Sequence, residues 1–70
     1  MQNNITIFVN GEKMEISRLK SLQELLVELE IDPNKVAIEK DLSIIHRQNL
    51  AKTFLEQNCS IEIVHFIGGG

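Results

Sequence analysis

Residues 5–16 read Ile-Thr-Ile-Phe-Val-Asn-Gly-Glu-Lys-Met-Glu-Ile, and this stretch decides the fold because two alternating apolar segments meet at Asn10-Gly11. A period of two predicts a strand with one face on a core, and Asn-Gly between two such strands is the strongest short-range signal of a β-hairpin. A hairpin with one apolar face needs a second layer to cover it, so the sequence that follows should supply that cover.

An amphipathic helix follows the hairpin, from about Ser21 to Glu30. Ser21 and Glu24 have the spacing of a capping box. Four leucines then recur at the spacing of one helix face: Leu22, Leu25, Leu26 and Leu29. We expect Asp32-Pro33 to end the helix, because proline has no N–H to donate and disfavours the helical conformation in the residue before it.

Short apolar segments alternate with turn residues in the second half of the chain. We expect a strand at 36–38, a turn at 40–41, an apolar stretch of undecided type at 42–45, a helical turn at 46–50, a brief strand at 53–55, a turn at 56–58 with Asn58 left-handed, and a last strand from 61. The order ββαββ predicts an α+β protein with the β-grasp arrangement of ubiquitin: a mixed sheet of four to five strands with one main helix packed across one face.

Length and composition favour a single folded domain over residues 1–70, and we expect the free protein to be a monomer. The chain is 43% hydrophobic and has a net charge of −3, from seven basic and ten acidic residues without a basic cluster. We therefore expect no nucleic-acid partner. With no apolar run of membrane length and no signal-like N-terminus, we expect no membrane partner, and a cytoplasmic location or, for an organelle-encoded chain, the plastid stroma.

The cysteine and the two histidines give no sign of a catalytic or metal site. Cys59 lies in a predicted turn with no base nearby to activate it, and a single cysteine cannot form an internal disulfide. His46 and His65 are far apart and have no acidic or cysteine neighbour at ligand spacing. We expect Cys59 to be a small structural residue in a connection, the two histidines to lie at the surface or half-buried, and no metal to be bound.

The sequence ends with an apolar alternating segment that runs into Gly68-Gly69-Gly70. Glycine has no Cβ, so such an end can extend and pass through a slot too narrow for other residues, and we expect residues 67–70 to form a flexible tail. This pattern points to the carboxylate of Gly70 as the reacting group, with Gly69 needed for close backbone approach.

The folded part should supply the docking surface. Apolar residues of the first and last strands are expected to face the helix: Ile5, Ile7, Val9, Ile61 and Ile63. Successive strand residues alternate faces, so Thr6, Phe8, Glu62, Val64 and Phe66 should point away. Phe8, Val64 and Phe66 would then form an exposed apolar patch leading to the tail, and we predict that these three, with Ile67 and Gly68, bind a partner.

The chain resembles the ThiS-type sulfur carrier of thiamine biosynthesis over essentially its full length. The resemblance is carried by the opening strand into Asn10-Gly11, by Leu22-Gln23-Glu24-Leu25-Leu26, by Val36-Ala37-Ile38-Glu39, by Ile44-Ile45-His46-Arg47 and by the ending from Ile63 to Gly70. Two departures lie in connections: His46 stands where the family often has proline, and Asn58-Cys59 replaces the usual Gly-Asp.

The resemblance implies a carrier and protein co-substrate, not an enzyme. An adenylating partner related to ubiquitin-activating enzymes would use ATP and Mg²⁺ to convert the Gly70 carboxylate to an acyl-adenylate, so this chain itself would bind no cofactor. Sulfur from a persulfide donor, such as a cysteine desulfurase, would then give a thiocarboxylate, and a thiazole synthase would accept that sulfur.

Three other interpretations remain open from the sequence. The small subunit of molybdopterin synthase shares the fold and the glycine end, but is usually longer and tends to carry prolines before its glycines, and Pro33 is the only proline here. A ubiquitin-like modifier would form an amide bond with a target lysine. An interaction module with incidental glycines is the last alternative.

Overall fold

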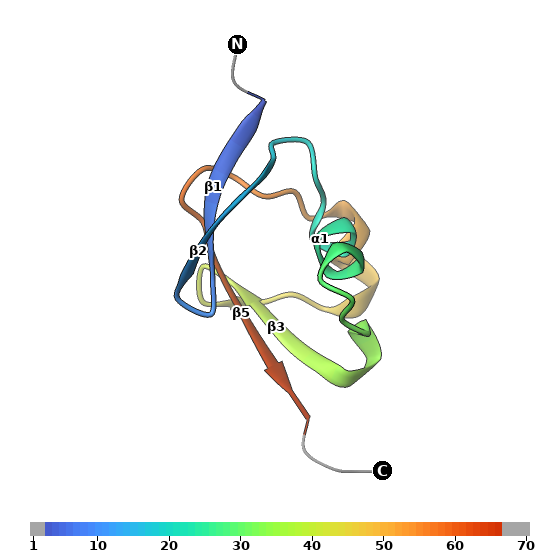
Figure 1. The fold of residues 1–70 in the computed structure, drawn as a ribbon. Coiled ribbons are helices and arrows are strands. Elements are labelled where there is room, and N and C mark those ends of the chain that lie inside the picture. The colour runs from blue at the N-terminus through green and yellow to red at the C-terminus, as the bar shows by residue number, and fades with distance from the viewer. Residues whose placement is uncertain (1–2, 67–70) are drawn as a thin grey trace.

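Over the residues that the structure describes, a five-stranded sheet has one main helix across a single face (Figure 1). The computed structural model describes residues 3–66. Its strands are β1 (Asn4–Val9), β2 (Glu12–Ser17), β3 (Val36–Lys40), β4 (Ser43–Ile44) and β5 (Ser60–His65). Its helical elements are α1 (Leu22–Glu28) and two 3-10 segments, η1 (Pro33–Lys35) and η2 (Arg47–Lys52).

The sheet has the order β2-β1-β5-β3-β4. β1 and β5 run parallel, and the other neighbouring strands are antiparallel. The predicted mixed sheet under one main helix is therefore confirmed. The predicted flexible tail, residues 67–70, lies outside the described residues.

The opening hairpin forms as the sequence predicts. β1 and β2 pair from Asn4 opposite Ser17 to Val9 opposite Glu12. Asn10 and Gly11 have φ values of 50° and 84°, the positive values that a type I′ turn requires at both central residues. Because the turn fixes the register, it also fixes which residues of β1 face the helix.

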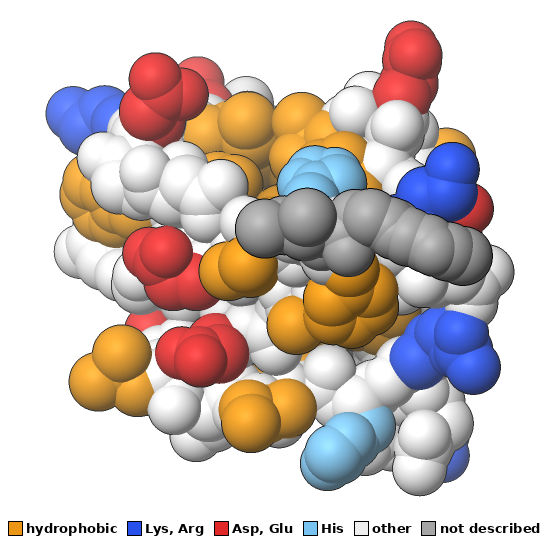
Figure 2. Space-filling model, turned by 90° about the horizontal axis from the view of Figure 1, so that it is seen from below, with side chains coloured by type: hydrophobic (Ala, Val, Ile, Leu, Met, Phe, Trp, Pro, Cys, Tyr) orange, Lys and Arg blue, Asp and Glu red, His pale blue; other side chains and the backbone are white. Residues whose placement is uncertain are grey.

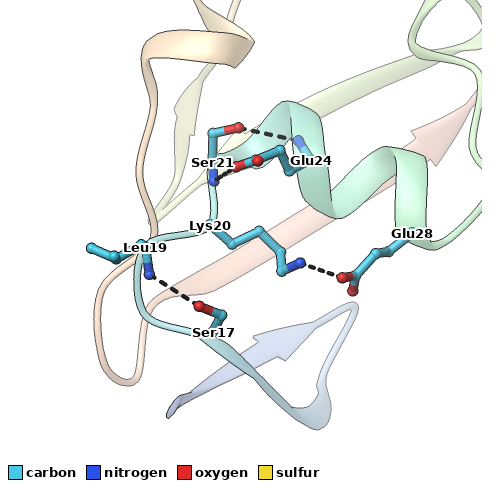
Figure 3. A network of polar contacts seen from close by, with 6 residues as sticks. All are labelled: Ser17, Leu19, Lys20, Ser21, Glu24 and Glu28. Atoms are coloured by element: carbon cyan, nitrogen blue, oxygen red, sulfur yellow. Dashed lines mark hydrogen bonds and ion pairs between the residues drawn. The ribbon is translucent and has the colours of Figure 1, made fainter. Parts of the chain in front are cut away.

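Helix α1 begins as predicted but ends earlier. Ser21 Oγ accepts the Glu24 N–H at 3.1 Å, and a Glu24 carboxylate oxygen accepts the Ser21 N–H at 2.8 Å, so the capping box is confirmed (Figure 3). At the other end Glu30 takes a left-handed φ of 59°, its N–H bonds to the Val27 carbonyl, and the Ile31 N–H bonds to that of Leu26. This is a Schellman motif, so the expected helix is present but ends at Glu28 with Leu29 as its C-cap, and the left-handed Glu30 ends it in place of the proline expected to do so.

The connections hold the other departures from prediction. The undecided stretch 42–45 contains the short strand β4, and the expected helical turn at 46–50 is η2. The expected strand at 53–55 is absent from the described chain, where Phe54 makes only an isolated bridge to Ser21. Asn58 has the predicted left-handed conformation, with φ of 67°.

The hydrophobic core lies between the sheet and the helical layer. Its buried members are Ile5, Ile7, Ile16, Leu22, Leu25, Leu26, Val36, Ile38, Leu50, Leu55, Cys59, Ile61 and Ile63. Val9 is partly buried against this cluster. The predicted inward-facing set on β1 and β5 is thereby confirmed, and the alternate residues of both strands are left to the outer face of the sheet.

Candidate functional site

β5 carries the chain toward the predicted tail and is supported differently along its length. It pairs with β1 only at Ser60 and Ile61, whereas it pairs with β3 up to His65, which lies opposite Val36. The Phe66 N–H then donates to the Lys35 carbonyl at 2.9 Å. The last residues of β5 are therefore held by β3 and η1, at the end of the molecule opposite the N-terminus (Figure 1).

Asn10 extends the support of β5 beyond the end of β1. Its backbone N–H donates to the Ile61 carbonyl at 2.8 Å. Its side-chain Oδ1 accepts the Ile63 N–H at 2.7 Å, and its Nδ2 donates to the Ile63 carbonyl at 3.2 Å. The amide thus binds both backbone groups of Ile63, as a neighbouring strand residue would, three residues before the end of the described chain.

The predicted apolar patch is divided in the structure. Val64 and Phe66 are 60% and 64% exposed, but Phe8 is half-buried and lies beside Ser60. Four residues along β5 separate Ser60 from Val64, which is about 13 Å at the rise of a strand. The expectation that Phe8 joins Val64 and Phe66 in one continuous cluster is therefore wrong, because the parallel register places it further back along the sheet.

The apolar neighbours of Val64 on the outer face come from β3 and β4 instead. Ala37 lies directly opposite Val64, and Ile44, which is 67% exposed, lies opposite Glu39. These residues share the face of Val64 because residues in register point to the same side of a sheet. The outer face near the predicted tail is thus framed by small and aliphatic side chains.

Two glutamates lie in the middle of this frame. Glu39 of β3 is directly opposite Glu62 of β5, and both are half-buried. Among the described residues, neither forms a salt bridge or a side-chain hydrogen bond. Like charges directly opposite one another in a sheet are destabilising, so we expect this pair to lower the stability of the free protein.

Basic groups gather on the other side of the same end. Lys35 in η1 is exposed, and the Arg47 guanidinium at the start of η2 donates to the Asn34 side-chain oxygen. Seen from below, most acidic side chains lie on the left, hydrophobic ones in the middle and most basic ones on the right (Figure 2). The end of the molecule where β5 finishes therefore has an acidic side and a basic side.

Nearly the whole chain matches one known protein family. The model of the ThiS family matches residues 7–70, which include β5 and the terminal glycines. The chain belongs to the ThiS family. The resemblance seen in the sequence is confirmed.

Relatives of two kinds accompany this ThiS match. A thiazole synthase from Paramagnetospirillum magneticum is 38% identical over 64 residues, which cover 91% of this chain and 20% of the relative. A thiazole synthase from Magnetococcus marinus is also 38% identical over 64 residues, which again cover 20% of the relative. An uncharacterized protein ycf40 from Porphyra purpurea is 31% identical over 100% of this chain and 99% of its own length.

A solved structure confirms the fold. The crystal structure of the thiamine biosynthesis protein ThiS from Geobacter metallireducens has a TM-score of 0.82, covers 94% of this chain and 100% of that chain, and is 23% identical. This likeness confirms the ubiquitin-like β-grasp arrangement of the ThiS-family chain. Of the predicted site residues, Ile67, Gly68, Gly69 and Gly70 lie outside the described residues.

Two other potentially reactive side chains of this ThiS-family chain, Cys59 and Lys40, are held within the fold by burial and by an ion pair. Cys59 is 4% exposed, burial raises the pKa of its thiol, and its carbonyl accepts the Phe8 N–H at 3.0 Å. The Glu56 carboxylate, 2.6 Å from the Lys40 ammonium, raises the pKa of that lysine. Within the described part of the chain, no group of three or more histidine, cysteine or carboxylate residues could hold a metal, and no helix could span a membrane.

Three features of the site do not follow from the sequence alone: the contact of the Asn10 side chain with β5, and the positions of Glu39 and of Ile44 beside it. The Asn10 side chain was assigned only to the turn, because nothing in a local pattern shows which distant strand a turn will meet. The sequence placed Glu62 on the outer face but gave no register for Glu39 or Ile44. Once β3 and β5 are paired antiparallel, alternation places Glu39 beside Glu62, so the strand order was the missing signal.

Proposed function

We propose that this chain is a sulfur carrier of thiamine biosynthesis, and that the carboxylate of Gly70 is the group that carries the sulfur. The observation on which this depends is the ThiS-family match, which extends through the terminal glycines. The chain acts as a protein co-substrate, and the catalytic groups belong to its partners.

The proposed chemistry activates a poor electrophile. An adenylating enzyme joins the Gly70 carboxylate to the α-phosphate of ATP, with Mg²⁺, and pyrophosphate leaves. The terminal sulfur of a persulfide, such as that on a cysteine desulfurase, attacks the acyl carbon and AMP leaves. A thiol then cleaves the resulting acyl disulfide and releases the thiocarboxylate. Gly69 and Gly70 suit this site because neither has a Cβ to obstruct approach.

A thiazole synthase is the proposed acceptor of the sulfur. The relatives named thiazole synthase contain a segment like this chain within a protein about five times as long, which supports a carrier and a synthase that work together. Linking two partners in one chain raises their effective concentration for each other. The proposed compartment is the cytoplasm or, if the chain is organelle-encoded, the plastid stroma, and the relatives named ycf40 are compatible with the second.

The proposed binding surface for these partners is the exposed end of β5. Val64 and Phe66 present large apolar surfaces there, and Ile67 and Gly68 would continue the contact toward the reacting group. Phe8 remains a proposed contact at the far side of the outer face, where this half-buried residue lies opposite Ser60. Exposed aromatic and aliphatic side chains of this kind are typical interface anchors.

Intact-mass spectrometry tests the proposal directly. The chain is incubated with the adenylating enzyme, ATP, Mg²⁺ and a persulfide donor, and the expected product has one carboxylate oxygen replaced by sulfur. A matched chain without Gly70 should acquire none, and equal labelling of that chain would refute the proposal. Added thiazole synthase should consume the sulfur, whereas adducts on other proteins would indicate a modifier instead.

A further inference from the structure

The outer face of the sheet has a charge pattern that the fold of the free chain does not explain. Glu39 and Glu62 lie directly opposite one another at its centre, half-buried and without a basic partner among the described residues. The adjacent Lys40 does not pair with either glutamate, because its ammonium forms ion pairs with Glu56 and Asp41. By register Lys13 shares the outer face beside Phe8, two strands away from β5.

Apolar residues enclose the two carboxylates on the same face. Ile44 lies beside Glu39, the Ala37–Val64 pair follows toward the end of β5, and Phe8 lies diagonally behind Glu62. A partner that covers these apolar side chains would also remove water from the carboxylates. Burying unpaired charge is costly, so such a partner must supply positive charge at this point.

We infer that this face docks on a protein surface that presents an arginine or lysine side chain between Glu39 and Glu62, within an apolar surround, and that the surface belongs to the adenylating enzyme. One arginine can bridge two carboxylates, because its planar guanidinium carries five donors in a fixed geometry. The inference rests on the proposed function and adds the chemistry that selects the partner.

Charge complementarity and continuity favour the adenylating enzyme. An enzyme that holds ATP must balance its phosphates with basic groups and Mg²⁺, so positive potential surrounds its nucleotide site. The proposed reacting carboxylate enters that site, and the same strand that leads to it carries Glu62 and Val64. The acidic outer face therefore meets the rim of the nucleotide site when β5 points inward.

Binding and stability should change in opposite directions when the pair is neutralised. The variants are Glu39→Gln, Glu62→Gln and the double variant, with Glu15→Gln as a control on the same face opposite Thr6 of β1. Each single variant should raise the KM of the adenylating enzyme for the chain about tenfold or more, as the loss of a close interfacial charge pair does. The midpoint of urea unfolding should stay the same or rise, because a like-charge contact is relieved.

Salt provides an independent measurement. The KM for the wild-type chain should rise with ionic strength, and the KM for the double variant should rise less, because the pair supplies the screened attraction. A double variant that keeps the wild-type KM, or a loss equal to that of Glu15→Gln, would overturn the inference. No sulfur on the wild-type chain would instead overturn the proposed function, so the two failures can be told apart.

Discussion

Asn10→Gly removes the side chain that binds β5 and keeps the turn. Asn10 has a left-handed φ of 50°, which glycine adopts without steric strain, so the substitution isolates the two hydrogen bonds to Ile63. Alanine would add backbone strain to the same loss, because a Cβ disfavours the left-handed region.

The expected loss follows from those two hydrogen bonds. They are part-buried, with lengths of 2.7 and 3.2 Å, and each intramolecular hydrogen bond contributes about 1 kcal/mol net. The free energy of unfolding should therefore fall by about 2 kcal/mol. For a domain of this size, such a loss lowers the melting temperature by about 10 °C.

Urea denaturation followed by circular dichroism measures the loss, and Asn58→Gly is the matched control. Asn58 also has a left-handed φ, of 67°, but its side chain only accepts a 3.3 Å contact from the exposed Gln57. The control should change the free energy of unfolding by a few tenths of a kcal/mol at most. Equal destabilisation by both variants would refute the reasoning, as would unchanged hydrogen exchange at the Ile63 amide in Asn10→Gly.

Three further predictions concern the cap, the turn and the thiol. The Ser21 N–H lowers the pKa of Glu24 from its ordinary 4.5, so the contribution of the Glu24 carboxylate to the free energy of unfolding is present above pH 4.5 and is lost as pH falls through the lowered pKa. Urea titrations at a series of pH values should show a smaller loss of stability at acid pH in Glu24→Gln than in the wild type. The same loss in both proteins would contradict this prediction. Gly11→Ala meets no atom within 4 Å but has φ of 84°, so denaturation should show a loss of about 1 kcal/mol from strain alone. Cys59 should react with thiol reagents only as the protein unfolds, and rapid labelling of the native chain would contradict its burial.

Local patterns predicted the elements whose causes are local. The alternation around Asn10-Gly11 and the Ser21–Glu24 spacing each act within a few residues, and both features formed as expected. The end of α1 was missed because Glu30 takes the left-handed position that glycine usually occupies, so no residue type marked it.

Long-range register explains what the sequence could not predict about the site. Alternation alone placed Phe8 and Val64 on one face, and this is correct, but alternation contains no information on the position of one strand along another. The parallel pairing of Phe8 with Ser60 then decides their separation. The contact between Asn10 and Ile63 joins residues 53 apart in the chain, so it too depends on how the strands assemble.

Along β5, residues that stabilise the core give way to residues exposed for binding between Ile63 and Val64. Ile61 and Ile63 are buried and are held on both sides, by β1 with Asn10 and by β3, so substitutions there should appear first in the free energy of unfolding. Val64 is 60% exposed and pairs with β3 alone, so its side chain contributes little to the core. The proposed carrier function needs this division, because a contact surface that also held the core together could not be varied for binding without lowering the stability of the domain.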